Sequence, residues 1–192
     1  MCGVCEQCDV ALGCVGAPPA PTCKTSTVHA GSKLKLKRNH ATGKVALGWT
    51  WTKGQATTLT ELGDPTTTTD YGFCLYGTVL GPLYVSANAP AGGLCRGRPC
   101  WSAAGAKGFV YRDGDRTPDG LLKTKILAGV AGAAKAVVKG KDVALDFPLF
   151  SGLSSMGPPL RAQLRGRNGM CLEAQYSNLT KSSVDNLRAT SD

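Results

Sequence analysis

Residues 33–51 read KLKLKRNHATGKVALGWTW and contain the pattern that indicates the fold. In KLKLKR (33–38) the leucines occupy one side of an extended chain and the lysines the other, which is typical of a half-buried strand with a charged outer face. VALGWTW (45–51) also alternates, with valine, leucine and both tryptophans on one side. NHATG between them has the composition of a hairpin loop. This stretch therefore predicts two antiparallel strands.

The rest of the chain repeats this design of short extended segments separated by turn residues. Strands of five to eight residues at intervals of about ten predict an all-β chain, an antiparallel β-sandwich or partly open barrel of about 8–10 short strands. One helical turn is predicted near TLTE, where Thr58 and Glu61 have the spacing of a capping box. The further predicted strands are FCLYGTVL (73–80), LYVSANA (83–89), WSAA (101–104), GFVYRDG (108–114), LLKTKILAG (121–129), AKAVVKG (134–140), VALDF (143–147), LRAQLRG (160–166) and MCLEAQYS (170–177).

Length and composition agree with one main domain and a small extension. The chain has 192 residues with 25 glycines and 11 prolines, and helix-forming residues are not concentrated anywhere. We expect a Cys-rich tail and proline linker at residues 1–24 and a β-sandwich module at residues 33–192. No stretch approaches the roughly 18 apolar residues of a membrane span, so none is predicted.

The five cysteines of the N-terminal tail are Cys2, Cys5, Cys8, Cys14 and Cys23. An iron–sulfur cluster of the bacterial four-iron type requires C-x2-C-x2-C-x3-C-P, but here the fourth cysteine comes six positions after the third and valine follows it. Zinc, for which paired C-x2-C knuckles are usual, and free thiols stay open as alternatives. Disulfides in an oxidising compartment are favoured. Five cysteines cannot all pair among themselves, so we expect a partner upstream in a longer polypeptide.

The four distal cysteines form an even set, which also favours disulfides. We predict that Cys95 pairs with Cys100, because a tight loop closes the four-residue gap between them. We predict that Cys74 pairs with Cys171, because both lie on the less apolar side of a strand.

Several motifs in the sandwich region resemble a β-rich module, without an assigned activity, of large secreted or surface proteins of bacteria. The resemblance covers the chain from about Lys33 to the C-terminus, and residues 2–23 are similar to the tail of Cys-rich repeats that precede such modules. It implies an extracellular or cell-surface location and upstream domains as partners, and it carries over no catalytic or binding residue. The motifs are Gly48-Trp49-Thr50-Trp51 with Lys53-Gly54, Gly63-Asp64-Pro65 with the threonines after it, Cys74 with Tyr76, Ala89-Pro90-Ala91-Gly92-Gly93, Pro99-Cys100-Trp101, Lys107-Gly108-Phe109 with Tyr111, Thr117-Pro118-Asp119-Gly120, Val138-Lys139-Gly140-Lys141, and Cys171 with Ala174 and Tyr176.

Basic residues outnumber acidic ones, and the excess is uneven. The formal net charge is +9, and residues 31–60 contain six basic and no acidic side chains. Such a balance indicates either a polyanionic partner or only a well-solvated surface, and the second is favoured because no arginine and aromatic stripe accompanies it. We expect no nucleic acid partner. If a polyanion binds, we expect weak binding at Lys33, Lys35, Lys37, Arg38 and Lys44.

No catalytic motif stands out. Nucleophilic catalysis needs a base beside serine or cysteine, and the two histidines, His29 and His40, fall in predicted linker and loop. Glycosidase chemistry needs two carboxylates at one cleft, and no pair is distinguished by sequence. We therefore predict that the chain is not an enzyme. The acidic candidates are Glu61, Asp64, Asp70 and Glu173.

RDGDRTPDG (112–120) has oxygen-bearing residues at every second position, as at the start of a calcium loop. Pro118 stands where that loop needs glycine, and Thr124 where it needs a bidentate glutamate. A polar turn is the favoured interpretation. No cofactor is expected, and calcium is a weak alternative. The candidate ligands are Asp113, Asp115, Thr117 and Asp119.

Eight aromatic residues either form a sugar-stacking platform or belong to the core. The core is favoured for Trp49 and Trp51, and we expect Trp101 to pack against a disulfide because it follows Cys100. The other aromatic residues of this set are Tyr71, Tyr76, Tyr84, Tyr111 and Tyr176.

Three functions stay open. The first is a non-catalytic extracellular or cell-surface module for spacing, adhesion or envelope attachment. The second is a carbohydrate- or polyanion-binding module, with a surface polysaccharide as partner, and the third and least favoured is a hydrolase.

Overall fold

Residues 33–51 form the hairpin that their alternating pattern predicts. In the computed structural model, which describes residues 2–77, 81–142, 144–145 and 153–192, strand β3 (Ser32–Arg38) pairs antiparallel with β4 (Val45–Gly54). The leucines of β3 and the tryptophans of β4 are buried, and the three lysines of β3 are exposed. The period of two thus places the apolar side chains of both strands on one face.

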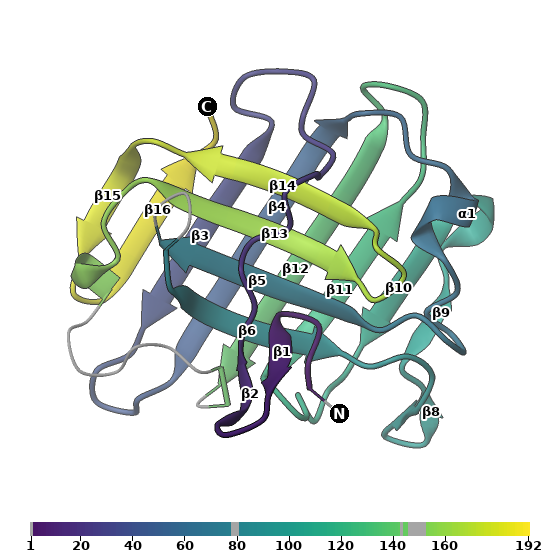
Figure 1. Ribbon diagram of the computed structural model, residues 1–192, viewed down its shortest axis with the longest axis horizontal. Coiled ribbons are helices and arrows are strands. Elements are labelled where there is room, and N and C mark those ends of the chain that lie inside the picture. Colours follow the sequence, from purple (N-terminus) through teal and green to yellow (C-terminus); the bar gives the residue numbers. More distant parts are fainter. Residues whose placement is uncertain (1, 78–80, 143, 146–152) are drawn as a thin grey trace.

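This hairpin is the centre of an eight-stranded antiparallel sheet with the order β15-β16-β3-β4-β12-β11-β10-β9. Its strands come from three parts of the chain, namely residues 32–54, 101–142 and 179–190 (Figure 1). The other six strands are β9 (Trp101–Ala103), β10 (Gly108–Arg112), β11 (Leu121–Leu127), β12 (Ala134–Asp142), β15 (Leu179–Ser183) and β16 (Asn186–Thr190).

A four-stranded antiparallel sheet with the order β14-β13-β5-β6 forms the second layer and lies in front of the first in Figure 1. The two layers do not close into a barrel, so the predicted fold class, an antiparallel β-sandwich, is confirmed. The sheets contain more strands than the 8–10 predicted. The four strands are β5 (Tyr71–Gly77), β6 (Leu83–Ala89), β13 (Leu160–Gly166) and β14 (Cys171–Tyr176).

Strands β15 and β16 are not predicted from the sequence, because LTKSS and NLRAT have few apolar residues. Most of the strand predicted at residues 143–147, and the end of the one at 73–80, lie outside the described residues. Several short elements complete the described part of the chain. They are β1 (Glu6–Asp9), β2 (Gly13–Gly16), β7 (Leu94–Cys95), β8 (Arg98–Pro99), and the 3₁₀ turns η1 (Gly105–Lys107) and η2 (Leu153–Ser155).

The helical turn α1 (Leu59–Leu62) begins with the capping box that the sequence predicts. The Thr58 hydroxyl accepts a hydrogen bond from the Glu61 backbone N–H, and the Glu61 carboxylate accepts one from the Thr58 backbone N–H. These two bonds satisfy donors that the first turn of a helix leaves without partners.

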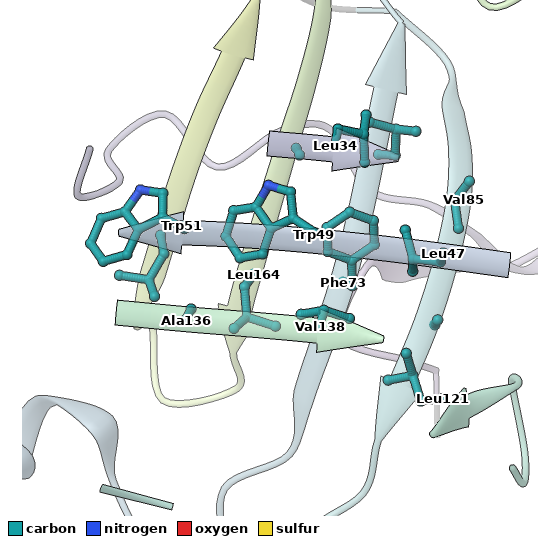
Figure 2. Close-up of a cluster of buried hydrophobic side chains, with 14 of the residues drawn as sticks. Leu34, Leu47, Trp49, Trp51, Phe73, Val85, Leu121, Ala136, Val138 and Leu164 are labelled. Atoms are coloured by element: carbon teal, nitrogen blue, oxygen red, sulfur yellow. The ribbon is translucent and has the colours of Figure 1, made fainter. Parts of the chain in front are cut away.

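The core lies between the two sheets. Figure 2 shows Trp49 and Trp51 of β4 among side chains of β12, β13 and β5, and the ring centroids of Trp49 and Phe73 are 5.6 Å apart. Both tryptophans are fully buried. The prediction that Trp49 and Trp51 belong to the core is therefore confirmed, and Trp101, 2% exposed, is buried in the same cluster together with Cys100.

Each tryptophan N–H has an acceptor, as expected for buried indoles. Trp49 donates to the Tyr176 hydroxyl at 2.9 Å, and Trp51 donates to the Glu173 carbonyl at 3.0 Å. Trp101 donates to the Pro90 carbonyl at 2.9 Å. The first two bonds join β4 of the larger sheet to β14 of the smaller one.

Residues 2–24 lie on the outer face of the four-stranded sheet, where the β1–β2 hairpin is in front in Figure 1. Disulfides Cys5–Cys74 and Cys23–Cys171 attach this segment to β5 and β14. The remaining bonds are Cys2–Cys14, which joins the residues before β1 to β2, and Cys95–Cys100. The prediction for Cys95–Cys100 is confirmed.

The predicted bond between Cys74 and Cys171 is wrong. The two residues lie on β5 and β14, and β13 separates these strands. Two strand spacings exceed 9 Å, roughly, whereas bonded cysteines have Cα atoms about 4.4–6.8 Å apart. Both sulfurs face the outer side of the sheet, as their strand patterns suggested, and each meets a cysteine of the covering N-terminal segment.

Candidate functional site

The outer face of the eight-stranded sheet is strongly basic. Besides Arg38 and Lys53 near strand ends, its strands carry eleven lysines and arginines whose side chains are exposed or half-exposed, while the inward positions are mostly apolar. We call this surface the basic face. The eleven cations are Lys33, Lys35, Lys37, Arg112, Lys123, Lys125, Lys135, Lys139, Lys141, Lys181 and Arg188.

One row of the basic face crosses seven neighbouring strands almost without interruption. Each residue of the row is paired in register with the next, and every member except Gly48 is cationic. Strands lie about 4.8 Å apart, so the six steps extend about 29 Å. We call these residues the basic row. They are, in order, Lys181, Arg188, Lys35, Gly48, Lys139, Lys123 and Arg112.

Acidic residues are scarce on this surface. Within the strands of the eight-stranded sheet the single acidic residue is Asp142, at the end of β12, and it forms an ion pair with Arg116 at 2.9 Å. The other ion pairs in the described part of the chain involve none of the eleven cations of the basic face. Positive charge is therefore in excess on this face, which makes the face attractive to a polyanion.

A hollow of about 680 Å³ lies at one end of β3 and β4. Lys37 and Lys141 of the basic face line it, together with Arg38 at the end of β3 and His40 and Lys44 of the hairpin loop. Asp185 is the one carboxylate in its lining. The other lining residues are Asn39, Thr42, Val45, Ala46 and Asn186.

The five cations that the sequence indicated as a weak polyanion site fall within one continuous surface. Lys33, Lys35 and Lys37 stand on β3, and Arg38 and Lys44 line the hollow beside it. The sequence did not indicate the cations of β10, β11, β12, β15 and β16. A signal existed in β11 and β12, because lysines recur at every second position of KTK and KGK. The pairing of β12 with β4 and of β11 with β10, however, could not be inferred from this alternation.

The acidic residues considered for catalysis each have partners. Glu61 forms an ion pair with Lys24, and the hydrogen bond from Lys24, with one from the Thr58 backbone, lowers the pKa of Glu61 to about 2. Asp64 accepts hydrogen bonds from the hydroxyls of Thr66 and Thr67, which lower its pKa. These two carboxylates organise a helix cap and a turn.

Asp70 and Glu173 are also paired with cations. Asp70 binds Arg167 at 2.8 Å, and Glu173 lies 3.6 Å from Arg161. Asp70 lines a hollow of about 350 Å³ that also contains Glu6 and Asp119. The Glu6 carboxylate accepts a hydrogen bond from the Gly3 backbone N–H. The Asp119 carboxylate accepts hydrogen bonds from the backbone and side-chain amides of Asn88.

The residues considered for calcium do not converge. Asp113 is buried and accepts hydrogen bonds from the backbone N–H groups of Asp115 and Thr117 at 2.8 and 2.7 Å. Asp115 pairs with Arg96, and Asp119 pairs with Asn88. The loop is thus an aspartate-organised turn. Among the described residues, the one group of three potential metal ligands is Cys2, Glu6 and Cys14, of which the cysteines are disulfide-bonded.

Cys8 is the one cysteine that is not in a disulfide, although disulfides were predicted for all nine. It faces Cys14 across the β1–β2 hairpin and its sulfur lies 3.0 Å from that of Cys2. Because Cys2 and Cys14 bond to each other, the hairpin leaves this third thiol exposed.

The aromatic residues form no exposed platform in the described part of the chain. Seven of the eight considered are buried, and Tyr84 is half-buried and packs against the core. Burial raises the pKa of Tyr71, Tyr111 and Tyr176 well above that of free tyrosine. Both histidines are exposed.

No family model, curated protein or solved structure matches the chain. None of the described helices is long and apolar enough to cross a membrane.

Proposed function

We propose that the chain is a non-catalytic module of an extracellular or cell-surface protein and that its basic face binds an acidic polysaccharide. The basic row carries this proposal, because six of seven neighbouring strands place a cation in it over about 29 Å of the sheet surface. Fixed positive charges spread over this distance match a polymer with repeated anionic groups better than they match a compact anion.

Two features favour a polysaccharide over a nucleic acid. Single-stranded nucleic acids are generally bound with aromatic side chains on which bases stack, and the aromatic residues considered above are buried or half-buried. The four disulfides also fit an oxidising compartment, where acidic polysaccharides are common and nucleic acids are not the usual partners. The same burial of aromatics disfavours stacking on neutral sugars.

The proposal of a non-catalytic role is supported by the state of the candidate carboxylates. Glu61, Asp70 and Glu173 are each in an ion pair with a basic residue. An acid and base pair for glycoside hydrolysis needs two carboxylates free to exchange protons with substrate. A surface module that binds an envelope or matrix polysaccharide would serve adhesion or attachment, with upstream domains of a longer polypeptide as its covalent partners.

Chromatography on immobilised heparin, a linear sulfated polysaccharide, tests this function. We expect the chain to be retained at about 0.1 M salt and released as salt screens the charges. Changing Lys35 and Lys139 to Gln should lower the salt concentration of elution and reduce the slope of log affinity against log salt by about two, one for each lost contact.

The matched control changes Arg98 and Lys107 to Gln, which removes two exposed charges outside the basic row. It should elute within a small shift of the wild type. Equal losses in both double variants would mean that net charge and not the basic row determines retention. No retention of the wild type at about 0.1 M salt would contradict the function itself. Preferential binding of single-stranded DNA of equal charge would replace the polysaccharide by nucleic acid.

A further inference from the structure

Two triplets of residues with the same composition lie side by side on the basic face. In each, a small residue of β4 is paired in register with a lysine of β3 on one side and a lysine of β12 on the other. The triplets are Lys35–Gly48–Lys139 and Lys37–Ala46–Lys141.

This arrangement makes a trough along β4. The two flanking strands lie about 9.6 Å apart, and the two lysine pairs are about 6.8 Å apart along the strand direction. Because lysine side chains stand well above the sheet while Gly48 and Ala46 do not, four ammonium groups surround a floor of small residues. The trough leads into the hollow of about 680 Å³, whose lining includes Lys37, Ala46 and Lys141.

Gly48 has no structural reason to be glycine. A Cβ atom built on it would meet a single neighbour, the Lys35 carbonyl oxygen at 3.9 Å, which is an ordinary contact. Its φ is not among the positive values that favour glycine, and β4 keeps its register with both neighbours at this position. Glycine inside a strand is destabilising relative to alanine, and it often marks a place where a ligand approaches the backbone closely.

We infer that Gly48 is the floor of a binding trough in which one linear anionic chain runs along β4, between the lysines of β3 and β12. The inference rests on the proposed binding of an acidic polysaccharide and gives the path of the chain on the basic face. A polysaccharide chain that crosses the strands along the basic row would have to lie on top of the lysine side chains and would contact no cation at Gly48. A chain along β4 has cations on both of its sides and backbone beneath it.

The ligand class follows from this geometry. A chain in the trough meets ammonium groups on its left and right, so its sulfate or carboxylate groups should project to both sides of its axis. Flanking strands whose backbones are about 9.6 Å apart leave room for one extended polysaccharide strand and exclude a bundle of chains. The hollow at the end of the trough, lined also by Arg38 and Lys44, would take one further anionic group of the same chain.

Replacing Gly48 by Val tests the path without changing any charge. Because the Cβ position is open and valine favours strands, we expect the variant to fold with an unchanged or higher melting temperature. We expect its affinity for size-defined heparin oligosaccharides, measured by calorimetry at about 0.1 M salt, to fall at least tenfold. Gly48→Ala should lose less, since a methyl group raises the floor only slightly.

Ser102→Val is the matched control, because it adds an apolar branched side chain to an exposed position of β9 on the same sheet. Its affinity should stay within twofold of the wild type. If Gly48→Val binds within twofold, or if it melts well below the wild type and so reveals a structural role for the glycine, the inference is overturned. In that case Lys35→Gln with Lys139→Gln still reports on the basic face, and a wild type that binds no heparin would instead refute the proposed function.

Discussion

The indole nitrogen of Trp49 donates a hydrogen bond to the Tyr176 hydroxyl at 2.9 Å and so joins the centre of the eight-stranded sheet to β14 of the four-stranded sheet. The same hydroxyl lies 2.7 Å from Ser32 Oγ, on the neighbouring strand β3. All three groups are buried. A fixed polar contact of this kind defines how the two layers sit on each other, because a displaced layer would leave a buried donor without an acceptor.

Replacing Tyr176 by Phe should therefore destabilise the fold. The change keeps the ring but leaves the Trp49 N–H without an acceptor, which costs about 1–3 kcal/mol of unfolding free energy. Urea denaturation followed by tryptophan fluorescence measures it. Tyr84→Phe, at a half-buried ring, is the control and should change stability by less than about 0.5 kcal/mol. Equal effects at the two positions would show that the Trp49 bond contributes nothing specific.

The disulfides should differ in their contribution to stability according to the loops they close. Cys23–Cys171 spans 148 positions and Cys95–Cys100 spans 5. In the chain-entropy model, serine pairs in place of these bonds cost about 5 and about 2 kcal/mol respectively. Thermal melts of the two double variants measure the difference. A larger loss from the short loop would contradict this ranking.

Cys8 should be the single reactive thiol of the folded chain. It is exposed, whereas the other eight cysteines are in disulfides. Titration with a coloured thiol reagent, without denaturant or reductant, should therefore give one thiol per chain, and Cys8→Ser should give none. Since the Cys8 side chain is exposed, the variant should keep the wild-type stability within about 0.5 kcal/mol. A wild type with no reactive thiol would refute the assignment of Cys8 as free.

The pH dependence of stability should include a term from Glu61. Its pKa is lowered from 4.5 to about 2 in the folded chain, first by Lys24 and then by the Thr58 N–H. A lowered pKa gives stability that is complete above about pH 4.5 and is lost as the pH falls toward 2. The side chain is 43% exposed, so screening limits the gain to roughly 1 kcal/mol or less.

Glu61→Gln should accordingly be less stable than the wild type at pH 7 and should approach it near pH 2. Urea unfolding at several pH values follows the difference between the two free energies. Thr58→Ala, which removes the hydroxyl acceptor of the cap, should cost about 1 kcal/mol, and this loss should persist at low pH because the hydroxyl does not titrate there. A difference between wild type and Glu61→Gln that stays constant from pH 7 to pH 2 would refute the role of the charge.

Local chemistry explains most of what the sequence predicted correctly. The alternation in KLKLKR and VALGWTW determines which side of each strand is buried, since neighbouring side chains of a strand point to opposite faces. The capping box at Thr58 and Glu61 and the Cys95–Cys100 bond also join residues close in the chain. Such features depend on a few neighbouring residues and are therefore readable without the fold.

Strands β15 and β16 show where local reading fails. Their sequences LTKSS and NLRAT have few apolar residues, and they become strands because β16 pairs with β3 and β15 pairs with β16. They bring Lys181 and Arg188 into line with Lys35. The disulfide Cys5–Cys74 is similar, because the side of β5 that bears Cys74 is covered by a segment 69 positions away.

The sequence by itself determined that the chain is a β-sandwich with a basic outer side on β3. Only the tertiary structure decided that lysines of β3 and β12 stand on either side of Gly48, because strand order and register arise from packing of the whole core. A shift of one residue would turn each lysine toward the core, so burial of the apolar face holds the register. The basic row is thus a product of the same long-range packing that buries Trp49 and Trp51.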